Sequence, residues 1–200
     1  MTKREMMKIV CSQLAIDYNC KPEDFNKDGV IFTIAEKQEG RREMPFITRR
    51  LEIITIGKSA IVNVSKNMMS FAKRKFEGKS NYDILTSKFV YGVNPYYLPD
   101  VEKIKTIENN SFRFKLIYDN IQLLYSNKDF HNALQYDADS KRPEVLAAVA
   151  YDEEKIVGIA CASADSKTMS QIGVDVLPHN IINKNTVKLV NMLTSETLDR

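Results

Sequence analysis

The residues with the clearest chemical potential lie near the C-terminus, where a strand-like segment meets a polar turn and a helix-like segment. Residues 169–177 (MSQIGVDVL) alternate polar and apolar for part of their length and stop at Pro178, which is typical of a half-buried strand. A helix that begins after residues 179–186 (HNIINKNT) leaves its first amide groups unpaired and directed at that turn. Such a corner could bind an anion, although most corners of this kind bind nothing.

Metal and disulfide chemistry find no support in the sequence. The three cysteines, Cys11, Cys20 and Cys161, are scattered and lack C-x-x-C spacing, while His131 and His179 are isolated from each other. An odd number of scattered cysteines predicts reduced thiols in a cytoplasmic protein, with neither a disulfide framework nor a metal site.

The segments before the corner extend this pattern. Residues 145–151 (VLAAVAY) and 156–160 (IVGIA), joined by DEEK, resemble strands two and three of the GNAT superfamily of acyl-CoA-dependent N-acetyltransferases. Residues 171–178 (QIGVDVLP) resemble that family's fourth strand, which grips the acyl-CoA. The resemblance covers about the last hundred residues. The first hundred, including residues 94–100 (NPYYLPD), resemble the extra N-terminal region of a clostridial-type subgroup.

This resemblance implies acetyl-CoA as co-substrate and a small-molecule or peptide amine as acceptor. The implied cofactor-binding groups are the main chain around Val174 and Val176 and the turn residues Asn183, Lys184, Asn185 and Thr186. No catalytic residue is assigned. Asp175 is the one carboxylate on the fourth strand and could accept the amine proton through water. The favoured alternative is that Asp175 faces solvent or pairs with a lysine.

The turn departs from the family pattern. The family usually has Q/R-x-x-G-x-G/A here, whereas by spacing this chain has Ile181, Lys184 and Thr186. Side chains in place of glycines hinder a close approach of phosphate to the main chain. Lys184 near a helix N-terminus, and Asn183 and Asn185 with their tolerance of left-handed geometry, compensate in part. We therefore expect weakened acyl-CoA binding.

The end of the chain sets a second expectation. The family continues with a fifth strand and further elements, whereas this sequence stops at Arg200, so we expect an incomplete GNAT-like domain whose fourth strand has one unpaired edge. An exposed apolar edge favours pairing with another chain, for instance a second copy in a homo-oligomer, or cover by the N-terminal half. A non-catalytic descendant that serves in assembly or regulation is thus the alternative to an active enzyme.

Composition and charge bound the remaining functions. The 200 residues are 44% hydrophobic and 28% charged, which suits one large or two small globular domains, and no segment is long enough to cross a bilayer. Residues 1–98 carry 17 Lys/Arg against 11 Asp/Glu, a net of +6, and the remainder 12 against 15, a net of −3. This asymmetry could steer an anionic partner, but a solvated face is the favoured explanation. The run Lys73-Arg74-Lys75 could form an RNA- or DNA-binding patch, but no aromatic residues interleave in a stacking pattern and no nucleic-acid motif surrounds it, so nucleic acid is not expected as a partner. A membrane partner is not expected either.

The elements that position the corner follow from hydrophobic periodicity. We predict an α+β fold with a smaller α+β N-terminal region over 1–98 and a GNAT-like region over 99–200, whose mixed, mostly antiparallel sheet is packed by helices. Predicted helices begin near Thr2 and at Ser80, and another carries Met68, Met69, Phe71, Ala72 and Phe76. Val187, Val190 and Leu193 form the apolar side of the last helix. Predicted strands cover 30–36, 51–56, 60–64, 90–93 and 112–117, in addition to the strand segments named above. Short helices are predicted over 121–125 and 130–136.

Overall fold

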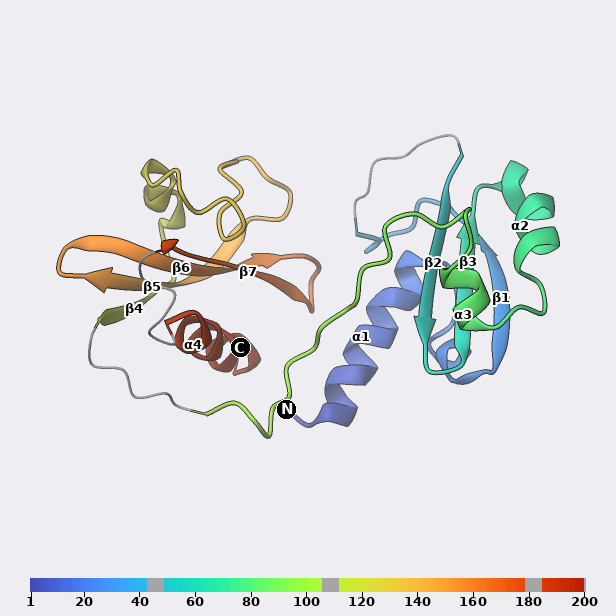
Figure 1. The fold of residues 1–200 in the computed structure, drawn as a ribbon, viewed down its shortest axis with the longest axis horizontal. Coiled ribbons are helices and arrows are strands. Elements are labelled where there is room, and N and C mark those ends of the chain that lie inside the picture. The colour runs from blue at the N-terminus through green and yellow to red at the C-terminus, as the bar shows by residue number, and fades with distance from the viewer. Residues whose placement is uncertain (43–48, 106–111, 179–184, 200) are drawn as a thin grey trace. The chain divides into compact units, whose positions relative to one another are not determined.

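The computed structural model describes residues 1–42, 49–105, 112–178 and 185–199, with the side chain of Asn185 excepted (Figure 1). The chain divides into two compact units, Arg4–Leu98 and Pro99–Arg200, the second grouped with Met1–Lys3. Each unit has its own sheet and its own hydrophobic core. The protein therefore has the α+β fold that the sequence predicts.

The N-terminal unit is built on a three-stranded mixed sheet. Its elements are α1 (Lys3–Asp17), the 3-10 turn η1 (Pro22–Asn26), β1 (Gly29–Ile34), β2 (Leu51–Ile56), β3 (Ser59–Val64), the 3-10 turn η2 (Lys66–Met68), α2 (Met69–Phe76) and α3 (Asn81–Leu85). The strand order is β1-β3-β2, with β1 parallel and β2 antiparallel to β3. Gly57, at a φ of 57°, makes the tight turn of the predicted β2–β3 hairpin.

The central strand β3 directs alternate side chains to two faces. Ala60, Val62 and Val64 are fully buried in a core that includes side chains of α2 and α3. On the opposite face, Ser59 donates a hydrogen bond to the carbonyl oxygen of Asp24, and Asn63 donates one to that of Tyr18. The polar side chains of this strand thus hold the chain that leaves α1.

The C-terminal unit is built on a four-stranded antiparallel sheet. Its elements are β4 (Arg113–Ile117), the 3-10 turn η3 (Ile121–Ser126), β5 (Glu144–Asp152), β6 (Lys155–Ala164), β7 (Ser170–Val176) and α4 (Asn185–Leu198). The strands pair in chain order, β4-β5-β6-β7. Strand β7, which contains the predicted coenzyme-binding residues, is therefore at one edge of this sheet.

Both faces of this sheet are covered. Leu146, Ala148 and Ala150 of β5 pack with Leu189 and Leu193 of α4 on one face. On the other face, Ala147 and Val149 of β5 pack against η3 and the segment that follows it. The residues contributed by that part of the chain are Ile121, Leu124, Phe130 and Leu134. In Figure 1, α4 and the chain around η3 accordingly lie on opposite sides of the sheet. The central strand β5 thus lies between two apolar layers.

The predicted helix over 130–136 is wrong, because this segment forms turns. The main-chain amide of Ala133 donates to the Asp175 carboxylate at 2.9 Å, and that of Gln135 donates to the Glu144 carboxylate at 2.7 Å. Amides that bond to side chains on other elements are not available for a helical ladder. Tyr136 ends the segment at a φ of 57°, in the left-handed region.

Two further sequence predictions are corrected by the structure. Residues 90–93 are not a strand, because they have no partner strand among the described residues. The last helix occurs as predicted, but Val187 is 50% exposed and Leu189 is buried in its place. The helix is rotated so that Leu189 packs onto Gly158 of β6, where an added Cβ would lie 2.9 Å from Leu189 Cδ1. No helix among the described residues combines the length and apolar character needed to cross a membrane.

Candidate functional site

The hydrogen-bond pattern between β6 and β7 determines which main-chain groups face outward. Just beyond the end of β7, the amide of Leu177 donates to the carbonyl of Val157 at 2.9 Å, and at the other end the amide of Asp165 donates to the carbonyl of Met169 at 3.0 Å. Both pairs belong to the single register that runs along the two strands. In an antiparallel pair, hydrogen-bonded and non-hydrogen-bonded residue pairs alternate.

Val174 and Val176 occupy the non-hydrogen-bonded positions of this ladder, opposite Ala160 and Gly158. Their N–H and C=O groups therefore point away from β6, to the outer edge of the sheet. No described strand pairs with that edge. Val174 and Val176 are the coenzyme-binding positions that the sequence predicts; their main-chain groups face the unpaired edge, while their side chains pack in the α4 core.

The structure describes only part of the predicted turn. Asn183, Lys184 and the substituted position Ile181 lie outside the described residues. Asn185 is the first residue of α4, and Thr186 is half-buried in the first turn of that helix. The strand therefore leads to a helix of 14 residues, as the sequence predicts, with the turn between them left as a prediction.

Asp175 has a different environment from either of the two expected. Its carboxylate accepts hydrogen bonds from the Asn132 amide at 2.7 Å, from Asn132 Nδ2 at 2.6 Å and from the Ala133 amide at 2.9 Å. No lysine among the described residues pairs with Asp175; the half-buried carboxylate is instead held by these three donors. These bonds direct the carboxylate to the loop on the sheet face, away from the free edge, so Asp175 positions the loop and is not placed as the base of the reaction.

Gly173 allows the same loop to lie directly on β7. A Cβ at this position would be 1.8 Å from the carbonyl oxygen of Asn132, so no other residue fits without movement of the main chain. Gly173 and Asp175 are two residues apart and share this face. A glycine inside a strand is a sequence signal for close main-chain approach, and it could have indicated this contact in advance.

A second polar cluster, which the sequence did not reveal, lies under η3. Glu144 is 7% exposed; its carboxylate accepts a hydrogen bond from Tyr125 Oη at 2.6 Å and one from the Gln135 amide at 2.7 Å. Burial, together with the Glu144 carboxylate, raises the pKa of Tyr125. The same two causes, burial first, raise the pKa of the Cys161 thiol to about 12. Cys161 is therefore a protonated thiol at neutral pH and lacks the reactivity of a nucleophile.

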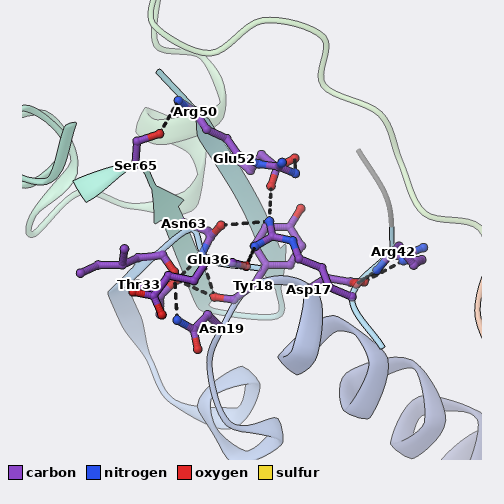
Figure 2. A network of polar contacts seen from close by, with 12 residues as sticks. Asp17, Tyr18, Asn19, Thr33, Glu36, Arg42, Arg50, Glu52, Asn63 and Ser65 are labelled. Atoms are coloured by element: carbon purple, nitrogen blue, oxygen red, sulfur yellow. Dashed lines mark hydrogen bonds and ion pairs between the residues drawn. The ribbon is translucent and has the colours of Figure 1, made fainter. Parts of the chain in front are cut away.

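The N-terminal unit contains a network of buried charges at the end of α1 (Figure 2). Asp17 accepts hydrogen bonds from the main-chain N–H of Arg42 at 2.9 Å and from its Nε at 2.7 Å. Arg41 donates to the Glu36 carbonyl at 2.7 Å and pairs with Glu52 at 3.3 Å. Burial lowers the pKa of the Arg41 guanidinium, with a further contribution from the nearby Arg50.

This network is structural in character. The side chain of Arg41 is 7% exposed and that of Asp17 is 9% exposed, so each charge requires the partner that it has. Arg42 pairs with Asp17, and Arg41 and Arg50 both pair with Glu52, so these charges are used within the network. The partners Asp17 and Arg42 are 25 positions apart in the sequence, which is why no local pattern indicated them.

Within the described residues, no group of three His, Cys, Asp or Glu side chains is arranged to hold a metal ion. Comparison of the chain with protein families, curated proteins and solved structures finds no match. Among the described residues, the free edge of β7 and the start of α4 form the candidate site.

Proposed function

We propose that the C-terminal unit binds acetyl-CoA along the outer edge of β7 and transfers its acetyl group to an amine. The observation that carries the proposal is the orientation of the Val174 and Val176 main chain toward an edge that no described strand covers. The pantetheine arm of the coenzyme contains two amides, which can bond to such an edge as a strand would. The resemblance of residues 171–178 to the family's coenzyme-binding strand supports the same assignment.

Acetyl transfer of this kind can proceed with main-chain groups and water, without a catalytic side chain. The amine attacks the thioester carbonyl, an amide bond forms, the carbon–sulfur bond breaks, and coenzyme A leaves as a thiolate that takes up a proton from water. An outward N–H of β7 can polarise the carbonyl oxygen, as oxyanion-hole donors do. Water accepts the amine proton in this proposal, because Asp175 is engaged with the loop. We place the reaction in the cytoplasm, which suits the free thiols Cys11, Cys20 and Cys161.

Isothermal titration with acetyl-CoA and with CoA tests the binding step. Val174→Pro removes an outward N–H that the ladder to β6 does not use, and proline is tolerated on an edge strand. We expect Val174→Pro to weaken acetyl-CoA binding about tenfold or more. The lost hydrogen bond between two uncharged amides is worth about 1 kcal/mol, and the proline ring also blocks the edge of β7. Val174→Ala keeps the N–H and serves as the matched control. An absence of heat at millimolar acetyl-CoA contradicts the proposal.

The second candidate function is assembly without catalysis. The same free edge favours it, because an unpaired strand is a template for a strand of another chain. Sedimentation over a range of concentrations separates the two candidates. Self-association that Val174→Pro abolishes, together with no release of thiol from acetyl-CoA, favours assembly. A monomer that binds acetyl-CoA and releases thiol in the presence of an amine favours the enzyme.

A further inference from the structure

The N-terminal unit carries a strong positive charge on the elements that follow its sheet. Residues 65–98 contain six Lys/Arg against two Asp/Glu, a net of +4. One of the two acids, Asp83, caps α3 through Ser80 and is therefore engaged locally. The charge is thus concentrated beside α2 and is not balanced within the segment.

We call the exposed cations of this region the α2 basic surface; it consists of Lys66, Lys73, Arg74, Lys75, Lys79 and Lys88. Within the part of the chain that the structure describes, none of these six side chains forms an ion pair. The buried side of α2, with Ala72 and Phe76, faces the core, so Lys73, Arg74 and Lys75 lie on the outer side of the helix. Unpaired cations gathered in this way create a field that attracts polyanions.

An aromatic ring lies within the α2 basic surface. Phe89 is 37% exposed, and its ring centroid is 4.8 Å from Lys75 Nζ and 5.5 Å from Lys88 Nζ. Its ring is held edge-on by Phe71 of α2, with centroids 5.3 Å apart. The chain brings Phe89 to Lys75 from 14 positions away, so the basic run does have an aromatic neighbour that its linear sequence does not show.

We propose that the α2 basic surface binds single-stranded nucleic acid, with Phe89 stacking on a base and the surrounding cations neutralising phosphates. Aromatic rings set among cations that follow the phosphate backbone are the usual means of binding single strands, because every unpaired base presents a flat face. A base that stacks on Phe89 displaces an ammonium group toward the adjacent phosphate. This activity resides in the N-terminal unit and does not depend on the acyl-transfer proposal.

Fluorescence anisotropy with the full chain tests this, using labelled single-stranded RNA and DNA of about 20 nucleotides and a duplex of the same length. We expect both single strands to bind more tightly than the duplex, with affinity that falls as salt rises from about 50 to about 200 mM. Lys73→Gln, Arg74→Gln and Lys75→Gln together should lower the affinity at least tenfold and reduce the slope of log K against log salt by about 2. Removing the same charge from the C-terminal unit, at Lys115, Lys155 and Lys167, should change neither quantity.

Variants of Phe89 separate stacking from charge. Phe89→Leu keeps an apolar side chain against Phe71 and should weaken binding about fivefold to a hundredfold, whereas Phe89→Trp should retain it. Circular dichroism checks that each variant is folded. The proposal is overturned if the wild-type chain binds no oligonucleotide, if heparin or duplex binds as tightly as the single strands, or if Phe89→Leu binds like the wild type.

Discussion

Gly173 and Asp175 hold the same loop by different means, one by the absence of a side chain and the other by three accepted hydrogen bonds. The residue types are therefore constrained by main-chain atoms, which cannot move out of the way as the end of a flexible side chain can. At both positions the contact partner is more than 40 residues earlier in the chain, at Asn132 and Ala133.

Gly173→Ala should lower the free energy of unfolding by about 1–3 kcal/mol, because the new Cβ meets the Asn132 carbonyl and forces the loop away from β7. Gly158→Ala is the matched comparison, since the close contacts of its Cβ are to side-chain atoms, Leu189 Cδ1 at 2.9 Å and Val176 Cγ2 at 3.1 Å, and not to main chain. Urea denaturation of both variants measures the difference. A smaller loss for Gly173→Ala than for Gly158→Ala would contradict the close contact of the loop with β7.

Tyr18 gives a pH dependence of stability. Burial, with the Glu52 carboxylate as the next contribution, raises its pKa from the ordinary 10.0 to about 12. Between these values the unfolded chain releases the phenolic proton and the folded chain retains it, so stability that is complete below pH 10 is lost as the pH rises toward 12. The loss attributable to this group is about 2–3 kcal/mol. Denaturation of the wild type and of Tyr18→Phe over this range measures it; equal slopes for the two proteins would show that Tyr18 is not the cause.

At the scale of elements, local sequence signals were sufficient wherever the structure itself is local. The capping box at Ser80 predicted the start of α3, and the alternating residues around Gly57 predicted the β2–β3 hairpin. The segment 130–136 could not be predicted, because its amides bond to Asp175 and Glu144 on distant strands. The rotation of α4 likewise depends on space at Gly158, which no periodicity encodes.

The capping box itself can be tested at this scale. Ser80 Oγ accepts a hydrogen bond from the Asp83 amide at 3.2 Å and donates one to its carboxylate at 2.7 Å. Ser80→Ala should therefore cost about 0.5–2 kcal/mol and increase amide exchange in α3, which has only five residues. Ser70→Ala, at an exposed position inside α2, removes a hydroxyl without a cap and should have little effect. Equal losses for the two variants would argue against a capping role.

At the scale of the whole molecule, the two units have separate sheets and separate cores, and the two proposals concern different units. The free edge of β7 could be placed from the sequence because strands joined by short connections pair in order. The contacts of Phe89 with Lys75 and of Asp17 with Arg42 could not be predicted, because they join residues that are distant in the sequence of the N-terminal unit. Separate cores also imply that damage to one unit stays within it.

Leu193→Ala tests this independence. Leu193 is fully buried between α4 and the C-terminal sheet, so the substitution should lower the stability of that unit by about 2–5 kcal/mol. Hydrogen exchange followed by peptide-resolved mass spectrometry should show faster exchange in β5, β6, β7 and α4, with β1, β2 and β3 unchanged. Phe76→Ala, which empties an equally buried position in the N-terminal core, should give the opposite distribution. If either substitution speeds exchange in both sheets, the units unfold together, and binding losses in variants of one unit could no longer be assigned to that unit alone.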